Sequence, residues 1–136
     1  MADNLITTTY TGSLNNGQSI PVTVMTCPGW TSAYLNLVVL IQDVNSNTNQ
    51  LYWGADYAVI QQWDTGPKIA LLAKNFSLDQ GQIPGGIYNL TVLPQGNNIV
   101  VTVTQKGFDT NSVYNITASV LMGQSGEMKS MAAART

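Results

Sequence analysis

Apolar and polar side chains alternate with a period of two along much of this chain, and this pattern constrains the fold most. Between residues 113 and 121 the apolar positions are Tyr114, Ile116, Ala118 and Val120. Successive side chains of a β-strand point to opposite faces of its sheet, so the pattern predicts a strand with one buried face. The same alternation recurs at residues 20–25, 87–93 and 99–105.

Shorter apolar runs and turn-forming residues complete the pattern. Further strand candidates are residues 6–10, 34–42, 50–53, 57–63 and 68–73. Glycine, proline and asparagine gather between the runs, at residues 15–17, 28–29, 45–49, 66–67, 84–86, 95–97 and 107. Short strands separated by such turn residues are typical of sandwiches and barrels. We therefore predict an all-β, single-domain antiparallel β-sandwich, jelly-roll or immunoglobulin-like, with about eight or nine strands.

Two segments resemble each other and a strand of immunoglobulin-like sandwiches. They are residues 86–92 and 113–117, in which Tyr88 and Tyr114 begin an alternating run. In that family an inward tyrosine opens such a strand. The resemblance is confined to these two segments, so it implies a fold and transfers no functional residue.

The chain has 136 residues, which suits one domain. We assign residues 1–122 to the β-sandwich and residues 123–136 to a C-terminal tail, because the strand pattern stops at Gly123. Residues 127–135 favour helix by propensity but are too few to form a stable helix alone. Two interpretations stay open: a frayed or flexible terminus, or an arm whose Met128 and Met131 dock on a neighbouring subunit.

The surface predicted from the composition is nearly neutral. Charged residues make up 9% of the chain and the net charge is −2, with the five cations scattered. Nucleic acid is therefore not an expected partner, because no basic patch is available for its phosphates. Docking on anionic lipid is disfavoured for the same reason. Weak net charge does little to keep copies apart, so we expect a homo-oligomer.

The single cysteine and the N-terminus bear on localisation. Cys27 cannot form an intramolecular disulfide and is expected to be a small buried hydrophobe. The N-terminal residues lack the charged and apolar regions of a secretory signal, and the longest apolar run, residues 37–41, is too short to cross a bilayer. We expect a soluble protein that is cytoplasmic or released by a non-classical route.

Catalytic and metal-binding patterns are weak. The chain has no histidine, so the commonest general base and the commonest zinc ligand are missing. Asp43, Asn45, Asn47 and Asn49 place oxygen ligands at every second position, as a calcium loop does. The match fails because Thr48 stands where the loop needs glycine and Gly54 where it needs glutamate. Asp56 and Asp64 are a conceivable carboxylate pair for glycoside cleavage, although their spacing does not require it. We predict no enzyme activity, no cofactor and no metal.

Aromatic residues cluster with amides and carboxylates in the first half of the chain. The candidate ligand-binding residues are Trp30, Tyr52, Trp53, Asp56, Tyr57, Gln61, Trp63 and Asp64. Flat rings can stack on the CH faces of a neutral sugar while amides and carboxylates bond its hydroxyls. The alternative is that these rings simply plug the ends of the sandwich.

Four classes of function stay open, and the sequence ranks them. A non-catalytic, lectin-like carbohydrate-binding module comes first, with avidity gained by oligomerisation. A structural subunit of a self-assembling particle or inclusion comes second, and it predicts large apolar interfaces between copies. A membrane-lipid-binding cytolysin component comes third, with tryptophan and tyrosine in the headgroup zone. An enzyme comes last, so the expected partner is a neutral glycan or another copy of the chain.

Overall fold

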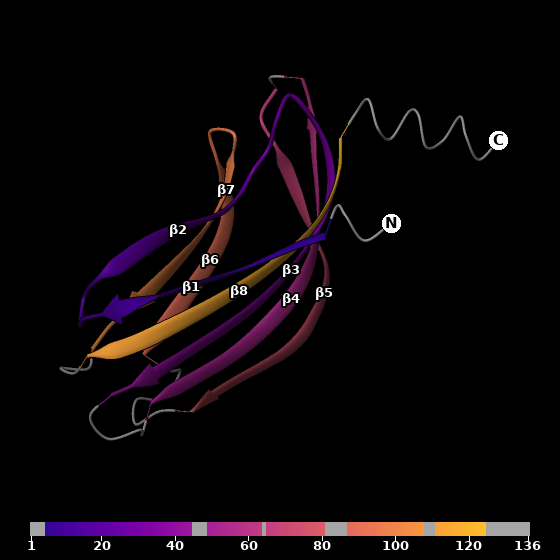
Figure 1. Ribbon diagram of the computed structural model, residues 1–136. Coiled ribbons are helices and arrows are strands. Elements are labelled where there is room, and N and C mark those ends of the chain that lie inside the picture. The colour runs from indigo at the N-terminus through magenta and orange to yellow at the C-terminus, as the bar shows by residue number, and fades with distance from the viewer. Residues whose placement is uncertain (1–4, 45–48, 64, 81–86, 108–110, 125–136) are drawn as a thin grey trace.

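The computed structural model describes residues 5–44, 49–63, 65–80, 87–107 and 111–124. These residues form eight strands in two antiparallel sheets (Figure 1). In chain order the strands are β1 (Leu5–Leu14), β2 (Ser19–Thr26), β3 (Trp30–Asp43), β4 (Gln50–Gln62), β5 (Lys68–Gln80), β6 (Tyr88–Gln95), β7 (Asn98–Gln105) and β8 (Ser112–Gln124). One sheet has the order β1-β8-β3-β4-β5 and the other has β2-β7-β6. The predicted antiparallel β-sandwich is confirmed.

The strand order places the two ends of the domain side by side. β1 pairs with β8, and β2 pairs with β7 in the opposite sheet. In the immunoglobulin arrangement the first strand pairs with the second, so this order is a different one. β3, β4 and β5 follow one another as an antiparallel meander. The result is a wide five-stranded sheet with β2, β6 and β7 on one side of it (Figure 1).

β4 is one continuous strand where the sequence predicts two runs, at residues 50–53 and 57–63. Gly54 lies within it and pairs with Val38 on β3 and Phe76 on β5. A glycine inside a strand often marks the close approach of another group. At Gly54 that group is the ring of Phe76, which takes the space a Cβ would fill. The glycine therefore accommodates a neighbour without ending the strand.

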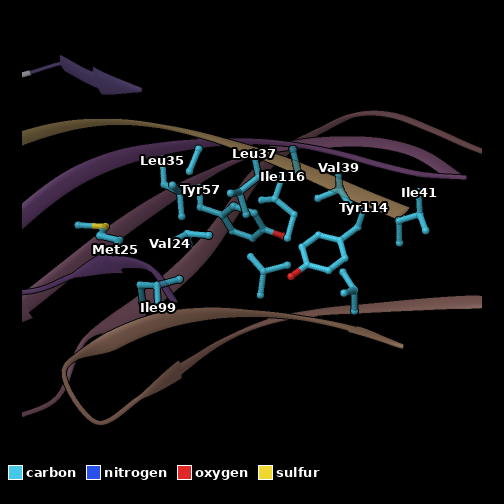
Figure 2. Packing of buried hydrophobic residues seen from close by; sticks show 14 of the residues in the cluster. Val24, Met25, Leu35, Leu37, Val39, Ile41, Tyr57, Ile99, Tyr114 and Ile116 are labelled. Atoms are coloured by element: carbon cyan, nitrogen blue, oxygen red, sulfur yellow. The ribbon is translucent and has the colours of Figure 1, made fainter. Parts of the chain in front are cut away.

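The core lies between the sheets and is built from alternate residues, as the period-two pattern predicts. β3 contributes Leu35, Leu37, Val39 and Ile41, all fully or almost fully buried (Figure 2). Burying each such side chain stabilises the fold by about 1.5–3 kcal/mol relative to exposure. Tyr114 on β8 also points into this core, where its ring lies over Gly12 of β1.

The hairpin between β6 and β7 is closed by a two-residue turn that depends on glycine. Gln95 pairs with Asn98, so the loop is the two residues Gly96 and Asn97. Gly96 has a φ of 61°. Glycine with positive φ at the first central position is the signature of a type II′ turn, whose twist matches that of the flanking strands. The turn predicted at residues 95–97 is confirmed.

One end of the sandwich interior is polar and is held by side-chain hydrogen bonds. Tyr88 Oη lies 2.7 Å from Ser112 Oγ, and Ser112 donates to Gln105 Oε1 at 2.6 Å. Asn49 Nδ2 donates to Asp43 Oδ2 at 3.2 Å. These five residues are buried, and buried polar groups require such partners. The Tyr88 hydroxyl also donates to the Asn49 carbonyl at 3.4 Å, so the network joins the first residues of β6 and β8 to the last residues of β3 and β7.

The segment tested as a calcium loop belongs to this polar end. Asp43 and Asn49 are paired with each other, and residues 45–48 lie outside the described residues. Within the described part of the chain, no group of three or more His, Cys, Asp or Glu side chains is placed to hold a metal ion.

Cys27 is buried just after β2 and is a free thiol. Burial raises the pKa of this thiol. Its backbone N–H donates to the Asn97 carbonyl at 2.7 Å, which ties this segment to the β6–β7 turn. Its position agrees with the small buried hydrophobe that the sequence predicts.

The end of β8 lies close to the predicted C-terminal boundary of the sandwich. β8 continues to Gln124, two residues past the boundary at residue 122. Residues 125–136, with Met128 and Met131, lie outside the described residues, as do the predicted helical positions. Across the described ranges, no helix has the length and apolarity needed to span a membrane.

Candidate functional site

Exposed aromatic and polar side chains share the outer face of the five-stranded sheet, meaning the face turned away from β2, β6 and β7 (Figure 1). Even-numbered residues of β3 and β4 face this way, because their odd-numbered neighbours fill the core. The register sets Tyr34 opposite Ala58, and Asn36 opposite Asp56. The outer face therefore gathers side chains that are far apart in the sequence.

Two tryptophans lie in contact at one end of this face. Trp30 begins β3, and Trp63 directly follows β4. Their ring centroids are 6.3 Å apart with the planes tilted by 50°, and 47% of Trp30 and 63% of Trp63 are exposed. We call these two residues the tryptophan pair. It offers ring surface to a ligand from solvent.

The backbone around Trp63 adopts an uncommon conformation. Trp63 has a φ of 53°, a left-handed value that is rare for a bulky residue and carries strain. The turn is closed by the Thr65 N–H and the Thr65 hydroxyl, both donating to the Gln62 carbonyl, at 3.2 and 2.7 Å. This conformation brings the Trp63 ring against Gly29, next to Trp30.

A buried glutamine supports the segment that precedes Trp30. Gln61 Nε2 donates to the carbonyls of Cys27 and Pro28, at 2.9 and 3.1 Å. The Thr31 hydroxyl donates to the same Pro28 carbonyl at 2.6 Å. These bonds fix the backbone of the segment that leads into Trp30. Gln61 thus has a structural role beneath the pair instead of a place on the surface.

A second group, which we call the Asp56 cluster, consists of Tyr34, Asn36, Asp56 and Asn75. Asn36 Nδ2 donates to Asp56 Oδ1 at 2.6 Å, and Tyr34 and Asn75 also hydrogen-bond this carboxylate. The bond from Asn36 does most to lower the pKa of Asp56, and the bond from Tyr34 adds to the effect. The same carboxylate raises the pKa of Tyr34. The ionised Asp56 carboxylate is therefore oriented on the sheet surface by hydrogen-bond donors that carry no charge.

A β-bulge brings Asn75 to Asp56. The register between β4 and β5 shifts between Gly54 and Ala55, so Asn75 is an extra residue on β5. Bulges re-aim side chains in this way. The next residue, Phe76, lies over Gly54 with its ring centroid 4.8 Å from that of Tyr52. The aromatic surface thus continues beyond the Asp56 cluster along β4.

Two hollows adjoin at the far end of the outer face and share Leu40 and Gln42. The larger, about 440 Å³, is lined on β1 and β8 by residues that include Thr11, Ser13 and Asn115. The smaller, about 210 Å³, is lined on β4 and β5 by residues that include Gln50, Tyr52 and Leu78. All the residues that line the two hollows are uncharged.

The structure divides the residues that the sequence singled out. Trp30 and Trp63 come together, and Tyr52 and Asp56 lie on the same outer face. Trp53 and Tyr57 pack on the inner face because they occupy odd-numbered positions, and Gln61 is buried. Asp64 lies outside the described residues. We therefore leave Trp53, Tyr57 and Gln61 out of the candidate site.

Sequence reasoning missed Tyr34, Asn36, Asn75 and Phe76. Tyr34 and Asn36 lie in the run at residues 34–42, which is apolar enough to suggest a strand buried on both faces. The three-stranded sheet covers only one face of β3, so its even-numbered residues meet solvent. The bulge that brings in Asn75 and the cross-strand partners of Asp56 have no local sequence signal.

No family model matches the chain, and no curated protein matches it. The solved structures similar to it include a tailspike protein of Acinetobacter baumannii phage AM24, at 11% identity and a TM-score of 0.46. Another is a tailspike protein of Acinetobacter baumannii bacteriophage Fri1, a capsular polysaccharide depolymerase, at 8% identity and a TM-score of 0.48. The matches cover 87% and 86% of this chain but only 26% and 18% of those chains. Such a loose likeness carries no argument about function.

Proposed function

We propose that this protein is a non-catalytic module that binds a neutral carbohydrate at the tryptophan pair and the Asp56 cluster. The observation that carries the proposal is Trp63, which holds a strained left-handed backbone while 63% of its side chain faces solvent. Glycine or asparagine would adopt this conformation with less strain. A bulky ring retained there, against Trp30, is explained if the ring itself binds a ligand.

The Asp56 cluster supports a sugar in particular. A carboxylate held by three neutral donors keeps lone pairs for further donors, and sugar hydroxyls are suitable donors. Tyr34 and Asn36 add a hydroxyl and an amide to the same surface. Trp30 and Tyr34 are four residues apart on one face of β3, about 13 Å along the strand. The stacking surface and the hydrogen-bonding groups therefore share one face of the sheet, where one oligosaccharide can contact both.

A glycan array tests the proposal. We expect the purified protein to bind a defined set of neutral glycans, and Trp63→Ala to weaken that binding about tenfold through loss of stacking. Asp56→Asn is expected to weaken it as well. Leu93→Ala is the matched control, because Leu93 is comparably exposed but lies on β6 in the other sheet.

Circular dichroism shows whether each variant is folded. The proposal fails if no glycan binds at high protein concentration, or if Trp63→Ala binds as the wild type does.

A second candidate function, a structural subunit of a self-assembling particle, is favoured by the edge strand β5. β5 is the last strand of its sheet, and Leu71, Leu72 and Leu78 are exposed on it. Exposed apolar edge strands favour association with other chains. Sedimentation velocity tests this: the wild type should sediment as an oligomer that Leu72→Lys dissociates and Leu93→Lys does not. A monomeric wild type would remove this candidate.

A further inference from the structure

We infer that the ligand is an extended stretch of a neutral polysaccharide lying along β3 and β4, instead of a single terminal sugar. This inference rests on the proposed function and names its ligand class more closely. It is carried by three features of the outer face: its line of aromatic rings, the glycine that keeps the line continuous, and the uncharged hollows at its far end.

The rings form a line along the strands. From the tryptophan pair the line passes Tyr34 and Phe76 and reaches Tyr52, which pairs with Leu40. Trp30 and Leu40 are ten residues apart on β3, which corresponds to about 34 Å at the rise of an antiparallel strand. Tyr52 is 49% exposed and Phe76 is 36% exposed, so their rings meet solvent. A single sugar unit would cover only one end of this line.

Gly54 keeps the line unbroken between the Asp56 cluster and Tyr52. Any side chain at this position would collide with the Phe76 ring, which lies over the strand there. Because the ring occupies that space, aromatic surface spans the row between Asp56 and Tyr52. Ring faces can stack on the apolar CH faces of successive sugar units.

The hollows give the far end of the line its polar partners. Gln42 and Asn115 line the larger hollow, and Gln42 and Gln50 line the smaller one beside Tyr52. Amides both donate and accept hydrogen bonds, which matches sugar hydroxyls, and no charged side chain lines either hollow to pair with a charged ligand. Exposed rings thus occur at both ends of the outer face, with the Asp56 cluster near one end and neutral amides at the other. A chain long enough to reach both would bind more tightly than a short one.

The experiment uses the full chain and isothermal titration calorimetry. The probes are size-fractionated malto-, cello- and manno-oligosaccharides, from disaccharide to decasaccharide, together with any neutral glycan that binds on the array. We expect affinity to rise more than tenfold with chain length. Tyr52→Ala should lower the affinity for long chains toward that for short ones and so flatten the length dependence, whereas Trp63→Ala should weaken the binding of short and long chains alike.

The controls separate the inference from the proposed function. Tyr52→Phe keeps the ring and should retain length dependence, and Leu93→Ala should behave as the wild type. Equal affinity for short and long chains, or Tyr52→Ala binding long chains as the wild type does, overturns the inference alone. If the wild type binds neither the oligosaccharides nor any array glycan, the proposed function falls and the inference falls with it.

Discussion

The ring of Phe76 lies across the backbone of Gly54, in the space that a Cβ on this residue would need. A similar relationship exists on the other side of the sheet, where Tyr114 lies over Gly12. The rings of Tyr114 and Phe76 differ in how far they are exposed to solvent. Tyr114 is buried in the core, whereas 36% of Phe76 is exposed to solvent.

Alanine at these two glycines should therefore have different consequences. Gly12→Ala overpacks the core against Tyr114 and should destabilise the protein by about 1–3 kcal/mol. Gly54→Ala should change stability by less than about 1 kcal/mol, because Phe76 swings outward. Urea unfolding midpoints check both values. Equal losses at the two sites would show that Phe76 is as firmly held as Tyr114.

The Asp56 carboxyl should titrate below its ordinary range because of Asn36. Its folded pKa is lowered, so the ionised form persists down to a pH below about 3.9, the value of an unperturbed aspartate. Any stability it contributes is present above the unfolded pKa and is lost as the pH falls through the folded pKa. Glycan binding should accordingly be flat from about pH 5 to 8 and decrease only in stronger acid.

Carbon NMR of the Asp56 carboxyl group measures this titration directly. Asn36→Ala removes the largest cause of the shift and should move the pKa of Asp56 up toward its ordinary value. Asn115→Ala, also on the outer face, is the control and should leave it unchanged. A pKa of Asp56 that Asn36→Ala does not move would contradict the hydrogen-bonded cluster.

Tyr88→Phe should destabilise the polar end of the interior. The Tyr88 hydroxyl is buried against Ser112 Oγ and the Asn49 carbonyl, at 2.7 and 3.4 Å. Its removal leaves buried polar groups with one partner fewer, at a cost of about 1–3 kcal/mol. Thermal unfolding of Tyr88→Phe beside Tyr52→Phe, whose hydroxyl is on an exposed side chain, measures the difference. An unchanged melting temperature for Tyr88→Phe would mean that this hydroxyl adds no net stability.

Cys27 should be unreactive in the native protein. Only 1% of the residue is exposed, and burial raises the pKa of its thiol, so little thiolate is present or accessible. We expect modification by Ellman's reagent at pH 8 to be orders of magnitude slower than in urea and to follow opening of the fold. Rapid labelling without denaturant would reveal local opening between β2 and the β6–β7 turn.

Much of the fold could be predicted from local pattern. The alternation at residues 99–105 and 113–121 fixes which side of each strand is buried, because the side-chain period of a strand is two. Gly96 and its neighbours predicted a turn, since glycine adopts positive φ without strain. Neither signal identifies which strands pair, so the placement of β1 beside β8 had no basis in the sequence.

The candidate site was predictable only in part. The tryptophans and Asp56 were identified by residue type, but Trp53 and Tyr57 share that chemistry and face the core. Trp53 and Tyr57 occupy odd-numbered positions of β4 and Asp56 an even-numbered one, so they point to opposite faces of the sheet. Because the neighbouring strand β3 is apolar on both faces, the sequence alone does not indicate which of these faces meets solvent.

The sequence by itself determined that this chain forms strands with one buried face, that its turns fall at glycine and asparagine, and that its surface is nearly neutral. These properties follow from the geometry and solvation of single residues and their near neighbours. Only the tertiary structure decided that Trp63 meets Trp30, that Asn36 and Asn75 hold Asp56, and that Phe76 covers Gly54. Each of these contacts joins different strands or strand ends, so it depends on strand pairing, register and a bulge, which are settled by packing of the whole domain.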